Sequence, residues 1–194
     1  METKYSDRFN FIDDEILREN ISLTFKYINF LILISKKKDY SDFSDVSYSI
    51  YKDMIVCTGS VIESCLHFCL KKYFELEKIK STDVMPCEWK NKICKKVYDI
   101  ALEKSEVCTI IRQKKPVKLT DITQFKDINT ACKKAEILNN ELYEKAEYIR
   151  DQRNKIHLTG LVMIDDFYTE NDTKNVFAYA KDLLTNIKNK LSTL

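Results

Sequence analysis

The chain has 194 residues, which is enough for one compact domain with a real core and too few to expect two. Its 44% hydrophobic and 32% charged residues with a net charge of +2 exclude a disordered chain and lack the basic excess of a strong nucleic-acid binder. Only 2 Gly and 2 Pro occur, and because all-β folds depend on tight turns rich in both, a mostly helical protein is favoured.

Helical periodicity predicts two long helices in the first part of the chain, over about 13–37 and 46–77. The first carries acidic residues at its start and lysines at its end, which suits the helix dipole. A polar loop over 39–45 separates the two helices. Gly59 lies inside the second helix, where glycine costs roughly 1 kcal/mol relative to alanine, and it would permit the close approach of another helix.

The middle of the chain predicts less regular structure. A break over 81–86 precedes a third helix over 88–104, in which we expect Trp89 to face inward. The stretch 106–120 begins with β-prone residues, and we expect extended or irregular chain there. This stretch ends in a basic loop, whose candidates for contact with an RNA backbone are Lys114, Lys115 and Lys118.

The last third of the chain again predicts helices. We expect a short helix over 121–133, a fourth major helix over 134–158 and a final helix over 173–191. Asp172 is the expected N-cap of the final helix, because an aspartate side chain can accept hydrogen bonds from the first free backbone amides.

The fold class that these elements predict is all-α. We expect an antiparallel bundle of four to six helices, forming one domain over 1–194. One short extended or β segment is expected near 106–120 or 161–168. The sequence contains no internal repeat and no low-complexity tail.

Seven Cys residues are scattered without a C-x-x-C pair, which is typical of reduced thiols in a cytosolic protein. The N-terminus lacks the basic and apolar regions of a signal peptide, and the longest apolar run, 30–34, is too short to span a bilayer. We therefore expect a cytoplasmic protein with no membrane partner. Cys65 and Cys69 share a helix face, but His67 points about 200° from Cys65, which favours packed thiols over a zinc site. No metal and no other cofactor is predicted.

One helical face near the end of the fourth predicted helix concentrates polar side chains. Because seven residues along a helix change direction by only about 20°, Arg150 and His157 lie on one face, with Asn154 between them. Arg153 lies on a flank of that face. The same stripe continues toward the N-terminus through Tyr143 and Glu147.

This set of side chains suits phosphodiester chemistry. A histidine transfers protons near neutral pH, and a guanidinium grips phosphate oxygens through two hydrogen bonds. RNA supplies its own nucleophile in the 2′-hydroxyl, so such a reaction requires no metal. From the spacing alone, however, a solvated or salt-bridged helix face with one incidental histidine is the commoner outcome.

The string Arg-Asp-Gln-Arg-Asn-Lys-Ile-His, from Arg150 to His157, resembles the signature of the HEPN superfamily. In that signature an Arg, usually followed by a small polar residue such as Asp151, precedes a His by four to six residues. Arg153 is separated from His157 by only three residues, so the resemblance assigns the catalytic Arg to Arg150 and makes Arg153 a supporting residue. Glu63, in the earlier long helix, is similar to an acidic position that family members often carry.

The resemblance implies a helical bundle that dimerises and brings two such motifs together at a cleft. Many HEPN proteins are metal-independent endoribonucleases in toxin–antitoxin, abortive-infection, restriction or CRISPR systems. By this resemblance His157 would be the general acid or base, and Arg150 would stabilise the pentacovalent phosphorus, giving a 2′,3′-cyclic phosphate and a 5′-hydroxyl. The implied partners are a second copy of the chain, an RNA substrate and an antitoxin or other defence-system protein.

Two alternatives stay open at this point. Some HEPN members have lost activity and only bind a nucleotide, RNA or a protein partner, and an unrelated helical scaffold could carry the motif by chance. One HEPN subgroup has a Tyr two residues after the His, which a nucleotidyltransferase antitoxin modifies. Thr159 occupies that position here, so this mode of control is not expected.

Overall fold

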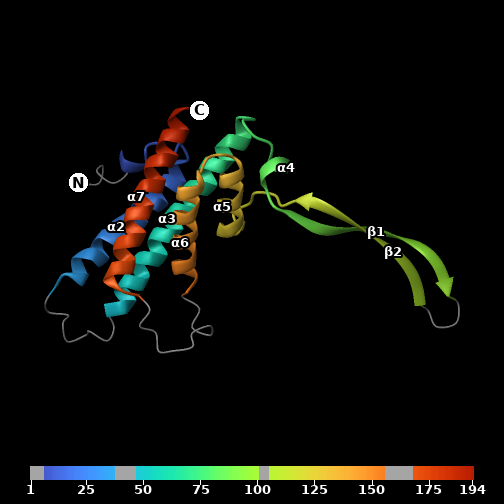
Figure 1. Ribbon diagram of the computed structural model, residues 1–194, viewed down its shortest axis with the longest axis horizontal. Coiled ribbons are helices and arrows are strands. Elements are labelled where there is room, and N and C mark those ends of the chain that lie inside the picture. The colour runs from blue at the N-terminus through green and yellow to red at the C-terminus, as the bar shows by residue number, and fades with distance from the viewer. Residues whose placement is uncertain (1–6, 38–46, 101–104, 156–167) are drawn as a thin grey trace.

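The computed structural model describes residues 7–37, 47–100, 105–155 and 168–194. Four long helices form its body: α2 (Glu15–Ser35), α3 (Ser47–Glu75), α6 (Asn140–Asn154) and α7 (Glu170–Ser192). Long helices that follow one another along the chain run in opposite directions, and α3 lies at the centre, where it contacts α2, α6 and α7 and runs in the same direction as α7 (Figure 1). The predicted class, a mainly helical antiparallel bundle with a β segment, is confirmed for the described residues.

Side-chain caps define where several of these helices begin. The Asp14 carboxylate accepts a hydrogen bond from the backbone N–H of Leu17 (3.0 Å) at the start of α2. At the start of α7, Thr169 and Asp172 each accept from the other's backbone N–H, which is a capping box. The prediction that Asp172 is the N-cap is therefore wrong by three residues: Thr169 is the cap, and Asp172 completes the box.

The core is built around the buried face of α3. Ile55, Ile62, Leu66 and Leu70 are each fully buried there. By length and composition, α3 is also the one helix in the described ranges that could cross a membrane, over Ser49–Glu75. Because 61% of its most apolar window is covered by the rest of the protein, packing in the bundle accounts for this apolar sequence.

The predicted third helix over 88–104 is wrong. The chain instead forms a β-hairpin of β1 (Cys87–Ile100) and β2 (Ser105–Pro116), paired antiparallel from Cys87 opposite Pro116 to Ile100 opposite Ser105. Extended chain was expected over 106–120, and β2 confirms it. Trp89 is 61% exposed and does not face inward, and the lysines expected in a basic loop, Lys114 and Lys115, are strand residues.

Two shorter helices, α4 (Ser81–Val84) and α5 (Phe125–Lys134), flank the hairpin, and a single 3-10 turn, η1 (Asp7–Phe9), precedes α2. α5 begins four residues later than the predicted 121–133 helix. The predicted helix over 134–158 is wrong in its first part, because the chain turns after α5 and α6 begins at Asn140.

Candidate functional site

The last turns of α6 carry the described part of the predicted motif. Arg150, Asp151, Arg153 and Asn154 lie on this helix, and Asn154, its last residue, is exposed. His157 lies outside the described residues, so its relation to Arg150 remains a prediction. The described residues do, however, define what surrounds each arginine.

Arg153 reaches across the bundle to α3. Its Nη1 donates to Oε2 of Glu63 at 2.5 Å, and both side chains are largely buried (28% and 23% exposed). Gly59, one turn earlier on α3, leaves room for the aliphatic part of Arg153: a Cβ atom at Gly59 would lie 3.1 Å from Arg153 Cδ and 3.3 Å from its Cβ. Close approach at Gly59 is thus confirmed, and Glu63 meets Arg153, the residue predicted to be supporting.

Arg150 is held by carboxylates of its own helix instead. Its guanidinium donates to Oε2 of Glu147 through Nε (3.1 Å) and Nη2 (2.9 Å), and Nη2 also lies 2.7 Å from Oδ1 of Asp151. The other oxygen of Glu147 accepts from Nδ2 of Asn129 on α5 at 2.7 Å. Glu147, predicted as part of the polar stripe, is therefore the residue that orients Arg150.

Asn129 was not singled out by its sequence, although it is fully buried and supports this network. Its Oδ1 is the one buried side-chain N or O atom in the described part of the chain without a hydrogen-bond partner. The bond to Glu147 ties this amide to α6, although an unpaired buried acceptor is costly. No local pattern marks Asn129, because its partner lies 18 residues away.

The two arginines differ in how readily they could bind a phosphate. Asp151 is 62% exposed, and an exposed ion pair contributes little, so an incoming phosphate can replace this carboxylate on Nη2 of Arg150. Glu147 is only 17% exposed and would keep the guanidinium oriented during that exchange. Arg153 is held by a partly buried carboxylate, which makes it a poorer phosphate ligand.

The other predicted site residues do not join this cluster. Tyr143 is half-buried, with the Lys133 ammonium 4.1 Å from its ring centroid. Lys114 and Lys115 lie on the hairpin, which extends away from α6 (Figure 1), and Lys118 lies between the hairpin and α5. Lys114 and Lys115 therefore lie apart from the arginines, whereas the backbone oxygen of Lys118 accepts a hydrogen bond from Oγ1 of Thr123 (3.4 Å).

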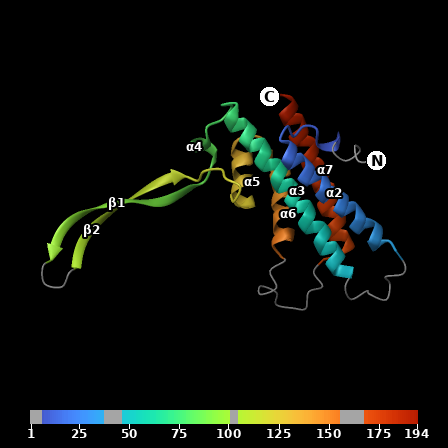
Figure 2. The ribbon, with the colours of Figure 1, turned by 180° about the vertical axis from the view of Figure 1, so that it is seen from behind.

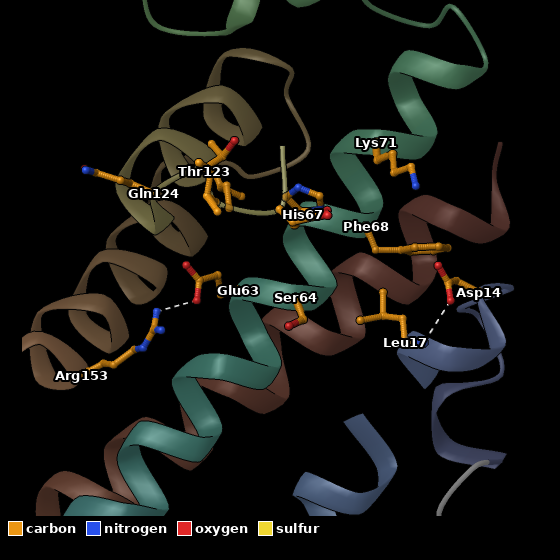
Figure 3. A pocket seen from close by; sticks show the side chains of 13 residues that line it. Asp14, Leu17, Glu63, Ser64, His67, Phe68, Lys71, Thr123, Gln124 and Arg153 are labelled. Carbon is orange, nitrogen blue, oxygen red and sulfur yellow. Dashed lines mark hydrogen bonds and ion pairs between the residues drawn. The ribbon is translucent and has the colours of Figure 1, made fainter. Parts of the chain in front are cut away.

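A polar pocket of about 560 Å³ opens beside the Glu63–Arg153 pair. Figure 3 shows Glu63 and Arg153 pointing toward each other at one end of it, and His67 and Lys71 further along α3. Its remaining walls come from the start of α2, from α3, and from α5 with the segment that leads into it, namely Asp14, Leu17, Ser64, Phe68, Asp121, Ile122, Thr123, Gln124 and Ile128.

His67 lines this pocket and was not predicted to be a site residue. Its Nε2 lies 3.1 Å from the backbone oxygen of Thr120, 53 residues away. The available signal was its position four residues after Glu63, which places both on one face of α3. Cys65 and Cys69 face the core instead, and burial raises the pKa of Cys69 to about 12. No group of three or more His, Cys, Asp or Glu in the described ranges could hold a metal ion.

Comparison of the chain with protein-family models, with curated proteins and with solved structures finds no match.

Proposed function

We propose that this chain is a metal-independent endoribonuclease of the HEPN type, acting as a homodimer in a toxin or phage-defence role in the cytoplasm. Arg150 binds the scissile phosphate and stabilises its extra negative charge in the transition state. His157 transfers the proton of the attacking 2′-hydroxyl or of the leaving 5′-oxygen. The RNA is cleaved to a 2′,3′-cyclic phosphate and a 5′-hydroxyl.

The observation that carries the proposal is the support built around the two arginines. Glu147, itself held by buried Asn129, orients Arg150, and Glu63 on α3 orients Arg153. A salt-bridged surface without function needs no buried amide and no mid-helix glycine to place its arginines. Orienting charged donors before the substrate arrives is what phosphoryl-transfer sites require.

A second function, phosphate or nucleotide binding without catalysis, is favoured by one observation. Both guanidiniums are already neutralised by carboxylates, and Arg150 contacts two of them. Such a module would bind RNA or a nucleotide at the same arginines and leave it intact, so cleavage is the property that separates the two functions.

The test is cleavage of a labelled RNA by the purified protein in EDTA. Wild type should cut, whereas His157→Ala and Arg150→Ala should each slow cleavage by roughly a hundredfold or more, because each removes a group that acts in the transition state. The matched control is His67→Gln, which replaces the chain's other histidine and keeps a donor for the Thr120 oxygen. Mass spectrometry should find a cyclic phosphate on the upstream product.

Three results would count against the nuclease. Wild type that leaves every RNA intact while still binding it would support the non-catalytic module. Equal cutting by His157→Ala would remove the motif from the reaction. Loss of cleavage in His67→Gln alone would move the reaction centre to the pocket on α3.

A further inference from the structure

The hairpin of β1 and β2 stands apart from the bundle. Figures 1 and 2 show it extending well beyond the helices, and its main contact with them is through α4. The two strands form a sheet of their own within the described part of the chain. A lone two-stranded hairpin is marginally stable in water, and its open edges favour pairing or adhesion. The exposure of this arm is best explained if it binds a partner.

Charge is distributed unevenly between this arm and the rest of the chain. The segment 87–116 carries 8 of the 32 Lys and Arg residues but only 4 of the 30 Asp and Glu residues. Its formal charge is therefore +4, which leaves −2 for the remaining residues of a chain whose total is +2. The small total had argued against a nucleic-acid binder, but it hides a basic projection on a slightly acidic body. Such a projection attracts a polyanion.

An aromatic side chain lies among these charges near the base of the arm. Trp89 is 61% exposed, and Lys114, its partner across the two strands, places Nζ 5.2 Å from the centroid of the indole ring. Lys115 and Arg112 are exposed on the same strand as Lys114. An exposed tryptophan next to cations is the arrangement on which single-stranded nucleic acids stack a base while their phosphates are neutralised.

We propose that this basic hairpin arm binds single-stranded RNA, with Trp89 stacking on a base while Lys114 and Arg112, two residues apart on one strand and so on the same face as Trp89, contact phosphates. The choice of RNA rests on the proposed function of the α6 motif, since the arm would then deliver substrate to the nuclease. Pairing with the arm of a second copy is disfavoured, because two surfaces of +4 charge repel each other.

The experiment measures binding of a labelled single-stranded RNA to the full chain carrying His157→Ala, which prevents cleavage. Arg112→Glu/Lys114→Glu should weaken binding by about tenfold or more and flatten the plot of log affinity against log salt by about 1.4. Trp89→Ala should weaken binding by roughly tenfold and leave the salt slope unchanged, because stacking releases no counterions. The control, Lys181→Glu/Lys188→Glu, makes the same charge change on exposed residues of α7, away from the arm.

Circular dichroism would first establish that the variants keep their helices. The proposal is overturned if the α7 control loses as much affinity as the arm variants, if the arm variants bind like wild type, or if single-stranded DNA of the same length binds more tightly than RNA. It is also overturned if the arm variants convert a dimer to monomers and leave RNA binding unchanged, since the arm would then hold a second copy.

The outcomes for arm and nuclease are separable. Arm-dependent RNA binding by a chain that cuts no RNA with His157 intact would refute the nuclease and keep the arm. Cleavage by wild type together with undiminished binding by the arm variants would keep the nuclease and refute the arm.

Discussion

Gly59 lies where α3 packs closely against Arg153 of α6. Alanine is normally favoured over glycine inside a helix by about 1 kcal/mol. At this position the added Cβ would lie 3.1 Å from Arg153 Cδ and 3.3 Å from Arg153 Cβ. Arg153 Cβ is fixed by the α6 backbone, so relief requires α6 to shift or the Arg153 side chain to leave Glu63.

We predict that Gly59→Ala is worse for stability in the wild-type chain than in an Arg153→Ala background. In a double-mutant cycle the coupling free energy should be about 0.5–1 kcal/mol, because the second background lacks the Cδ atom that crowds the new methyl. Urea denaturation followed by circular dichroism measures all four variants. Additive effects would mean that Gly59 does not control how Arg153 is placed.

Sequence reasoning recovered part of this residue-scale picture. Helical periodicity correctly placed Glu147 next to Arg150, because residues three apart on one regular helix lie on the same side. Glu63 was singled out only through a resemblance, and its partner proved to be Arg153. His67 and Asn129 were missed because their contacts, Thr120 and Glu147, lie 53 and 18 residues away. Periodicity describes one helix and carries no information about such pairs.

At the scale of elements, the spacing of apolar residues predicted the long helices well. It failed where a segment pairs as a strand with a neighbouring segment. The start and end of α2 lie within two residues of the predicted 13–37 helix. Apolar residues at helical spacing also suggested a helix over 88–104, but residues 88–100 of it form β1 and pair with the β-prone chain of β2. Local helix propensity contributes little free energy, and pairing with a complementary strand outweighed it here.

The break between α5 and α6 was also invisible to periodicity. Ile137 and Leu138 are buried in the turn that follows α5, so the apolar pattern continues through it while the helix does not. Glu136 adopts a left-handed backbone conformation there, with φ of 56°. An L-residue with a side chain pays roughly 1–2 kcal/mol for this conformation, and glycine does not.

We predict that Glu136→Gly stabilises the fold by about 0.5–1 kcal/mol, the relief of strain being partly offset by the greater freedom of glycine in the unfolded chain. The matched control is Glu144→Gly, at an exposed position inside α6, where the same change should destabilise the fold by about 1 kcal/mol. Chemical denaturation of both variants gives the sign of each change in the free energy of unfolding. Destabilisation by Glu136→Gly would mean that the glutamate side chain, and not the backbone, holds this turn.

At the scale of the whole molecule, one copy of the chain supplies only one histidine within the proposed motif. Cleavage by 2′-hydroxyl attack needs a base for that hydroxyl and an acid for the leaving oxygen. The chain has two histidines, and His67 lies in the α3 pocket with Nε2 at the Thr120 oxygen. If His157 supplies one proton transfer, the second histidine of the same kind must come from a symmetric partner.

This requirement predicts how activity responds when subunits are mixed. Wild type and His157→Ala are combined in equal amounts and allowed to exchange subunits. If each cleft needs His157 from both protomers, only wild-type homodimers are active, so cleavage should fall to about a quarter of that of undiluted wild type at the same total protein. Protomers that act independently would retain about half.

The control is the same mixture assayed before exchange, which should retain half the activity under either model. A fall from half to a quarter as exchange proceeds would place both copies of His157 in one reaction centre. A constant half, with exchange verified by native mass spectrometry of differently tagged subunits, would mean that a single protomer performs the whole reaction. Another group of the same chain, outside the histidines, would then have to be its second proton carrier.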